Sequence, residues 1–374
     1  MTTRATIEIP TAPGTTSGFV RNAWYGAFWS SDLESGALRA RTILDEPIVF
    51  FRTAAGQVAA LEDMCPHRFA PLSLGHVVAD GLLECAYHGL RFNSAGSCVY
   101  NPHGEHKIPP AAKARSYPVV EKHTLIWIWM GDGEPDMAAV PDYHQFDTTD
   151  PVYVTKGDYL KLAADYRLIT DNLLDLSHVP FLHGGLLGDP KAVVADVAVT
   201  QEGNSVTQSR WSYDVPVASV FDMLFRNDGK PVDFWMIMNW KPTGCMILDV
   251  GVRAPGSPKE SGTGYYAVHI LTPESATSTH YHFAAIRFTA PPRSAAEDLE
   301  IRDKLGAGRR YAFEVQDGPM IEAQQLRMLG IGATRRPALL SVDAGPVRVQ
   351  RILAGLVSDE RSSHASPTRA KVNA

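Results

Sequence analysis

Residues 65–89 read CPHRFAPLSLGHVVADGLLECAYHG, and a short cysteine–histidine pair stands at each end of this stretch. Cys65 and His67 form the first pair, Cys85 and His88 form the second, and seventeen residues separate the pairs. A Rieske-type [2Fe–2S] cluster requires this donor set, because two thiolates hold one iron and two imidazoles hold the other. Neutral imidazoles in place of charged thiolates raise the reduction potential, so the pattern predicts an electron-transfer cluster.

A structural zinc ion is the alternative use of the same four residues, because zinc also accepts two cysteines and two histidines. Zinc motifs usually pair like ligands, whereas each pair here joins one cysteine to one histidine. Pro66 and Gly89 also suit the tight loops that surround a cluster. The mixed pairing therefore favours the cluster. The other two cysteines, Cys98 and Cys245, are expected to pack as small apolar side chains.

Composition and charge limit the classes of function that remain possible. The chain has 374 residues, which predicts two or three domains, and 45% of them are hydrophobic. The net charge is −6 and the basic residues are scattered, which argues against a nucleic-acid partner or an anionic membrane. The longest apolar run, Leu125–Met130, is far shorter than a membrane span. We expect a cytoplasmic protein that acts on a small organic molecule.

The distribution of strand and helix patterns predicts an α+β protein of two parts. An all-β cluster domain is expected over residues 19–140, and a second domain over residues 141–358 should hold a long antiparallel sheet flanked by helices, of the helix-grip type. Flexible tails are expected at 1–18 and 359–374. The predicted strands are 47–52, 117–120, 124–130, 205–214, 234–240, 246–253, 265–271 and 280–289, and the predicted helices are 161–182, 295–329 and 345–357.

A second motif begins the second domain and reads DNLLDLSHVPFLH over residues 171–183. Mononuclear iron(II) oxygenases bind the metal through two histidines and one carboxylate on one face, which leaves positions open for O₂ and substrate. His178 and His183 are five residues apart, so on an unbroken helix they would point about 140° apart. Pro180 between them should disturb the helix and let both histidines reach one ion.

Asp175 precedes His178 by three residues, which on a helix places both on one face. This position suggests that the carboxylate orients the histidine instead of binding metal itself. The alternative is that both histidines are ordinary helix-end residues and that Asp175 is a solvated acid. A third ligand must come from a distant carboxylate, and the candidates near the C-terminus are Asp298, Asp303, Glu314, Asp317 and Glu322.

Both motifs, in this order, resemble the Rieske non-haem iron oxygenases. The similarity rests on the two Cys–His pairs, on Tyr87, Gly89 and Phe92, and on the pattern N-x₂-D-x₂-H-x₄-H that begins at Asn172, and it extends from Arg21 to Val357. Many members have tryptophan where this chain has Leu90.

The resemblance implies a set of roles and partners. Asp317 is the implied third iron ligand, because residues 313–323 are similar to the family's segment that carries it, and Asn172 lies in the outer shell. Asp317 is followed by Gly-Pro, so it could instead cap a helix that starts near Pro319, which would leave Glu314 as the ligand. The family also implies a homotrimer in which Asp175 links His88 of one subunit to His178 of the next.

A particular branch of the family is indicated by the strings at 269–274 and 336–344. They resemble the branch with vanillate and dicamba O-demethylases, toluenesulfonate methyl-monooxygenase and chloroacetanilide N-dealkylases. This implies a terminal oxygenase component that uses O₂ for oxidative N-dealkylation or O-demethylation of an aromatic xenobiotic. Electrons would come from NADH or NADPH through a ferredoxin or a flavin reductase. Hydroxylation of an aryl methyl group or ring without dealkylation is the alternative. A pure Rieske electron carrier is the rival of another class, and it needs only about 100 residues.

The substrate pocket is expected between the strands of the second domain, whose segments at 221–225, 234–240 and 245–250 are rich in aromatic residues and methionine. These residues could equally be plain core. The predicted pocket residues are Phe225, Met236, Met238, Leu248 and His269. The strings contain no arginine placed to clamp a carboxylate, since Arg226 and Arg253 lie at run ends, which favours a neutral substrate.

Overall fold

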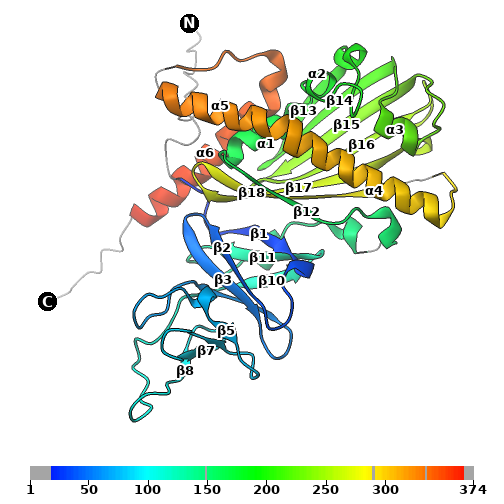
Figure 1. The fold of residues 1–374 in the computed structure, drawn as a ribbon. Helices are drawn as coiled ribbons and strands as arrows, with labels where there is room; N and C mark the ends of the chain where they lie inside the picture. The colour runs from blue at the N-terminus through cyan, green and yellow to red at the C-terminus, as the bar shows by residue number, and fades with distance from the viewer. Residues whose placement is uncertain (1–17, 148–149, 289–290, 333–334, 366–374) are drawn as a thin grey trace, which may run out of the picture.

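The computed structural model describes residues 18–147, 150–288, 291–332 and 335–365. It has an N-terminal part made of small sheets and a C-terminal part in which helices cover one large antiparallel sheet (Figure 1). The predicted α+β class is therefore confirmed. None of the helices in the described part of the chain combines the length and the apolar content of a bilayer span.

Three small sheets form the N-terminal part. The first has the order β1–β11–β10, the second β2–β3–β4–β9 and the third β5–β6–β7–β8. Their bounds are β1 Ala23–Trp29, β2 Leu38–Ile43, β3 Glu46–Arg52, β4 Val58–Glu62, β5 His76–Val77, β6 Leu83–Glu84, β7 Arg91–Phe92, β8 Cys98–Tyr100, β9 Ser116–Tyr117, β10 Val119–Lys122 and β11 Leu125–Met130. The strands predicted at 47–52 and 124–130 are confirmed, and the one predicted at 117–120 is divided between β9 and β10.

Strand β3 separates two apolar cores, because successive side chains of a strand point to opposite faces. Ile48 and Phe50 pack into a core with β1 and β11. Val49 and Phe51 pack into a second core that also contains Cys65 and Cys85. The two cysteines of the first motif thus belong to the same core as one face of β3, whose residues 48–51 are buried.

A seven-stranded antiparallel sheet of order β12–β18–β17–β16–β15–β14–β13 forms the C-terminal part. Its strands are β12 Asp158–Leu162, β13 Asp196–Glu202, β14 Ser205–Val215, β15 Val232–Lys241, β16 Cys245–Arg253, β17 Thr263–Ser275 and β18 Ser278–Phe288. The five strands predicted between 205 and 289 are confirmed. Register pairs Met238 with Leu248, and Leu248 with Ala267, so side chains at every second position line one face.

Helices cover this face of the sheet, and α4 and α5 run across it in Figure 1. They are α1 Tyr166–Leu174, α2 Val179–Leu182, α3 Ser219–Leu224, α4 Ala295–Tyr311, the π-helix η8 Ala312–Asp317, α5 Gly318–Ile331 and α6 Ala344–Ala365. Apolar side chains from the helices and the strands form one large core. The sheet therefore serves as the floor of a compartment whose roof is helical.

Several predicted boundaries are wrong. The helix predicted at 161–182 is a strand end followed by two helices, since α1 ends at Leu174 and α2 starts at Val179. The helix predicted at 295–329 contains a π-helical turn, and the tail predicted from residue 359 begins as the end of α6. Residues 1–17 and 366–374 of the predicted tails lie outside the described residues. No predicted strand range covers β1, β2, β4, β5, β6, β7, β8, β12 or β13, because their apolar runs are short or interrupted.

The two parts meet where β1 lies against β17. The Thr272 hydroxyl donates to the Gly26 carbonyl at 2.6 Å, and the Thr243 hydroxyl donates to the Trp24 carbonyl at 3.1 Å. A Cβ at Gly26 would lie 2.7 Å from the Ile270 side chain, so only glycine permits this approach. The junction fixes the cluster loops at the far end of the molecule from α1 and α2 (Figure 1).

Candidate metal centres and pocket

The two histidines of the second motif lie at the two ends of α2. His178 is the N-cap residue of this four-residue helix and His183 is its C-cap residue. Pro180 lies in the first turn of α2, where a missing N–H costs nothing. The predicted kink at Pro180 is therefore wrong, because the chain already leaves helical geometry at Asp175 and restarts at His178. One short helix, capped by a histidine at each end, brings both rings together.

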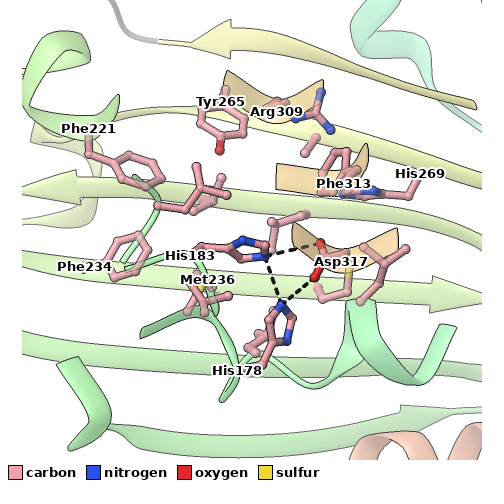
Figure 2. A pocket seen from close by; sticks show the side chains of 18 residues that line it. His178, His183, Phe221, Phe234, Met236, Tyr265, His269, Arg309, Phe313 and Asp317 are labelled. Carbon is pink, nitrogen blue, oxygen red and sulfur yellow. Dashed lines mark hydrogen bonds and ion pairs between the residues drawn. The ribbon is translucent and has the colours of Figure 1, made fainter. Parts of the chain in front are cut away.

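These histidines and Asp317 form a compact group (Figure 2). The Nε2 atoms of His178 and His183 lie 3.2 Å apart. The Asp317 carboxylate lies 3.6 Å from His178 Nε2 through Oδ1 and 3.3 Å from His183 Nε2 through Oδ2. All three ligand atoms lie within 4.8 Å of one another. Two imidazoles and one carboxylate in this arrangement fit the ligand set of a mononuclear iron(II) site.

Three neighbours orient the group. His178 Nδ1 donates to the backbone carbonyl of Asp175, and His183 Nδ1 lies 2.8 Å from Gln316 Oε1. Asn172 Nδ2 donates to Asp317 Oδ1 at 3.1 Å. Each Nδ1 bond fixes the tautomer whose Nε2 carries the lone pair that a metal requires. Gln316 was not predicted, although its place beside Asp317 was a usable signal.

The predicted contact between the Asp175 carboxylate and His178 is corrected by the structure. Asp175 is the C-cap residue of α1 and His178 belongs to the next helix, so they share no helix face. The carboxylate Oδ1 instead accepts from the backbone N–H and the hydroxyl of Ser177, at 3.0 and 2.5 Å. Oδ2 accepts no hydrogen bond from the described residues. The backbone of Asp175 therefore orients His178, and the half-buried carboxylate is left for another partner.

Of the five candidate carboxylates, Asp317 is the one that lies beside His178 and His183. Asp317 has helical backbone angles and its side chain makes no cap hydrogen bond, so the predicted alternative of a helix cap is wrong. The other four are engaged elsewhere: Asp298 with Arg287, Asp303 with Arg302, Glu314 with Arg310, and Glu322 with the Ala163 N–H. Asp317 ends the π-helix η8, and π-helical turns are frequent at functional sites.

Burial and charge act in opposite directions on the two histidines. Burial is the main reason that the pKa of His178 is lowered, which favours the neutral ring that binds metals. Burial also acts to lower the pKa of His183, but the hydrogen bond and the charge of Asp317 outweigh it, so that pKa is raised. Asp317 and His183 are only 3% and 2% exposed, so a cation bound between them would be well shielded from water.

The two loops of the first motif have the same backbone geometry. The Cys65 N–H donates to the Ala70 carbonyl and the Cys85 N–H donates to the Leu90 carbonyl, both at 2.8 Å. The residues Phe69 and Gly89 have matching positions and positive φ angles of 60° and 68°. Phe69 adopts a conformation that non-glycine residues rarely take, which marks this loop as constrained. The loops are therefore a symmetric pair, as a clamp for one cluster requires.

The four donors of this motif lie in two adjacent pairs, one of thiols and one of imidazoles. The rings of His67 and His88 lie 4.5 Å apart. Burial is the main cause that raises the pKa of Cys65 to about 11, and a hydrogen bond that its thiol shares with the neighbouring Cys85 sulfur also raises it. The cysteines are buried while His67 is exposed, so the sulfur side faces the core and the imidazole side faces outward. Two adjacent thiols and two adjacent imidazoles fit a Rieske cluster with its histidine-bound iron toward the surface.

Comparisons with known proteins agree with both centres. Residues 23–118 match the Rieske [2Fe-2S] domain, and residues 162–359 match the Vanillate O-demethylase oxygenase C-terminal domain. The chain is 38% identical to the oxygenase component of dicamba O-demethylase from Stenotrophomonas maltophilia, over 89% of this chain and 96% of that protein. It is 35% identical to the oxygenase component of chloroacetanilide N-alkylformylase from Rhizorhabdus wittichii, over 91% and 97%. The chain belongs to the Rieske oxygenases.

Solved structures support the same conclusion. The crystal structure of dicamba monooxygenase bound to 3,6-dichlorosalicylic acid superposes with a TM-score of 0.85 at 36% identity, covering 92% of this chain and 99% of that one. Another structure of that enzyme contains non-haem iron and dicamba. This Rieske oxygenase is thus an enzyme that uses a [2Fe–2S] cluster and a mononuclear iron. The matched segments leave residues 119–161 between them, and the predicted domain boundaries stay predictions.

An apolar pocket of the Rieske oxygenase opens beside the candidate iron ligands (Figure 2). Of the predicted pocket residues, Met236, Met238, Leu248 and His269 line it. Phe225 does not, because it ends α3 and packs under the Arg226 guanidinium, and Phe221 one turn earlier points into the pocket instead. The predicted set therefore erred by one helical turn.

Two polar groups of this lining stand out. Burial lowers the pKa of His269 well below its usual value, so its ring is neutral. Nδ1 forms a hydrogen bond with the Tyr281 hydroxyl at 2.6 Å, and Nε2 has no hydrogen-bond partner among the described residues. Arg309 also lines the pocket, from the last turn of α4, and it was not predicted. The only signal in the sequence was that Arg309 precedes Asp317 by eight residues. This spacing places the two side chains on one helical face only when the π-helical turn between them is known.

Proposed function

We propose that this Rieske oxygenase removes an alkyl group from a small aromatic compound by oxidising the carbon next to an oxygen or a nitrogen atom. The observation that carries the proposal is the position of the candidate iron ligands at one end of an apolar pocket. His178, His183 and Asp317 line the same pocket as the apolar side chains of three sheet strands. A bound aromatic ring would therefore lie beside the metal with little water around it.

The names of the relatives support this reaction class. Similar proteins are oxygenase components named dicamba O-demethylase, vanillate O-demethylase and chloroacetanilide N-alkylformylase. Another is named for toluene-4-sulfonate monooxygenation in Comamonas testosteroni, which supports methyl hydroxylation as the second candidate. Both reactions insert oxygen into a C–H bond next to the ring or to its heteroatom. The dealkylation follows because the hydroxylated carbon beside O or N leaves as an aldehyde.

Each residue of the centre has a distinct part in this reaction. We assign His178, His183 and Asp317 as the residues that would hold the iron, beside the pocket that they line. The iron activates O₂ and the cluster supplies single electrons when both are bound. Asn172, Gln316 and the Asp175 carbonyl keep the ligands in register. The apolar lining excludes water, so the substrate carbon is the preferred target of the oxidation.

Electrons require a second subunit in this proposal. The cluster loops and α2 lie at opposite ends of one chain (Figure 1), so a direct path within the chain is long. The exposed His67 and the half-buried Asp175 both reach the surface. We infer a homotrimer in which the free Oδ2 of Asp175 accepts a hydrogen bond from His88 of the partner subunit. Asp175 would then couple the cluster to His178 through its own backbone.

An external donor must reload the cluster. The exposed apolar side chains Phe69, Leu74 and Tyr87 surround the cluster loops and suit a transient protein partner. We propose a ferredoxin or a flavin reductase that draws on NADH or NADPH. A cytoplasmic location fits this supply, and the four cysteines form no disulfide with one another.

The reaction is tested by product analysis with purified protein, a reductase, NADH or NADPH, and O₂. A panel of aryl methyl ethers and N-alkyl anilides should include a compound that releases about one aldehyde per O₂ consumed. A hydroxymethyl product without aldehyde would identify the methyl-hydroxylation alternative instead. A cis-diol on the ring would refute the assignment to this branch. Reduction of the cluster with no oxygenated product from any compound would identify an electron carrier.

A further inference from the structure

Arg309 lines the pocket and is only 2% exposed. No carboxylate in the described part of the chain lies within ion-pair distance of it. Its neighbours are the aromatic rings of Phe313, Phe283 and Tyr265, whose centroids lie 5.4, 5.6 and 5.9 Å from Cζ. The Nη2 atom is fully enclosed and has no hydrogen-bond acceptor. The pocket therefore contains a cation that nothing in the described protein neutralises.

Other buried arginines of the chain show what is missing. Arg287 pairs with the Asp298 carboxylate at 2.8 Å, and Arg210 donates to the carbonyls of Ala192 and Val193. Arg167, which is half-buried, pairs with Asp165. A buried charge without an oxygen partner is costly, and ring contacts compensate it only in part. Arg309 thus differs from its counterparts in that its oxygen acceptor is absent.

The one anion of the pocket itself does not fill this place. The Asp317 carboxylate is already held by both histidines and by Asn172. Figure 2 shows Arg309 and Tyr265 on the far side of the pocket side chains from His178. Tyr265 is only 3% exposed, and its hydroxyl makes no hydrogen bond with the described residues. A second donor therefore accompanies the guanidinium at the end of the pocket that is remote from the metal ligands.

We propose that Arg309 binds an anionic group of the substrate, an aromatic carboxylate or sulfonate, with the Tyr265 hydroxyl as a second donor. The anion at this end would direct the opposite end of the ring toward His178, His183 and Asp317. Specificity and orientation then come from one charged contact within an otherwise apolar pocket. This inference rests on the proposed function, because it names the substrate class of the same site. This inference reverses the expectation of a neutral substrate, because that expectation was based only on the arginines near the strands of the second domain.

The experiment compares matched probes that differ in charge. Isothermal titration of the iron- and cluster-loaded protein, without O₂, measures the binding of methoxy- and methylamino-substituted benzoates, their benzamides and 4-methoxybenzenesulfonate. Each titration is repeated with Arg309→Met, which keeps apolar volume, and with Arg309→Gln, which keeps a polar head. Arg310→Met is the matched control, because the neighbouring Arg310 is more exposed and pairs with Asp158 and Glu314 outside the pocket.

Charge-assisted hydrogen bonds predict that the best anion binds roughly 10- to 100-fold more tightly than its amide. Arg309→Met and Arg309→Gln should remove this preference and leave amide binding within about threefold, while Arg310→Met should retain it. The carboxylate and sulfonate arms then decide which anion is preferred. If Arg309→Met does not fold, Arg309→Gln decides the test alone.

Two results would overturn the inference. One is that no anion of the panel binds the wild-type protein more tightly than its amide, and the other is that the preference survives both Arg309 variants. If the amides release aldehyde and no anion preference is found, Arg309 is not a substrate anchor, but the proposed dealkylation stands. Anion preference without aldehyde from any probe would keep the anchor and reject the dealkylation.

Discussion

The two metal centres are built in opposite ways. The cluster ligands come from two neighbouring loops with the same hydrogen bonds, and the imidazole side faces outward. The iron ligands come from a short helix and from a π-helical turn much further along the chain, and Asp317 and His183 are almost fully enclosed. An electron-transfer centre must be reached by another protein, whereas a centre that oxidises C–H bonds must exclude water. The cluster is thus exposed because it exchanges electrons with another protein, and the iron site is buried because it must exclude water.

The largest expected effect concerns the ligand that is distant in sequence. Asp317→Ala should lose the mononuclear iron and lower turnover by more than about 100-fold, because losing even an outer-shell partner of a metal ligand costs about 10- to 100-fold. The cluster spectrum should not change, since its loops lie in the other part of the molecule. Iron analysis and visible absorption of the purified variant measure both.

Glu314→Ala is the matched control for that variant, because Glu314 is exposed and pairs with Arg310 in the same helical region. It should keep the mononuclear iron and at least half of the turnover. If Glu314→Ala loses the iron while Asp317→Ala retains it, the assignment of the third ligand is reversed.

The second test concerns Asp175, which is proposed to link the exposed cluster to the buried iron site. Asp175→Asn keeps the backbone carbonyl that orients His178, so most of the mononuclear iron and the whole cluster should remain. Turnover should nevertheless fall almost completely, because the charge toward the partner subunit is lost. Stopped-flow absorption should show fast reduction of the cluster by its donor and slow reoxidation by O₂ with substrate bound. Near-normal turnover would mark Asp175 as an ordinary surface acid.

How much was predictable from sequence differs between the centres for the same reason. Four cluster ligands in two local pairs carry their geometry in their spacing, and the long sheet strands carry theirs in alternating apolar residues. The break of helix at Asp175 and the π-helical turn before Gly318 depend on packing against the sheet, so spacing along an ideal helix misplaced them. Gln316 and Arg309 are ordinary polar residues of a helix, and only the folded chain shows which way they point.

A smaller effect is expected where a residue supports a ligand without binding the metal. Gln316→Leu removes the acceptor for His183 Nδ1, which should weaken iron binding by about 10- to 100-fold and leave the cluster unchanged. Gln316→Glu retains an acceptor oxygen and should restore most of the affinity. Titration of the metal-depleted protein with iron(II) gives both values. Equal losses in the two variants would mean that Gln316 serves packing and not the orientation of His183.

The smallest effect concerns the burial around the iron centre. Burial raises the pKa of Asp171, next to Asn172, to about 7, and Gln350 donates to it at 2.9 Å. Between pH 4 and 7 the folded chain keeps a proton that the unfolded chain releases, so the free energy of unfolding falls as pH rises. Asp171→Asn should avoid this loss and gain on the order of 1 kcal/mol relative to the wild type between pH 5 and 8. Urea unfolding at both pH values measures it, and a pH-independent difference would contradict this degree of burial.

The most direct test of two separate iron centres is the amount of iron and inorganic sulfide per chain in three proteins prepared together. The wild type should contain about three irons and two sulfides. Cys85→Ser should lose the sulfide and about two irons, and His183→Ala should lose about one iron and keep the sulfide together with the rhombic EPR signal of the reduced cluster. Zinc in place of iron and sulfide, or the joint loss of all iron in His183→Ala, would contradict the account.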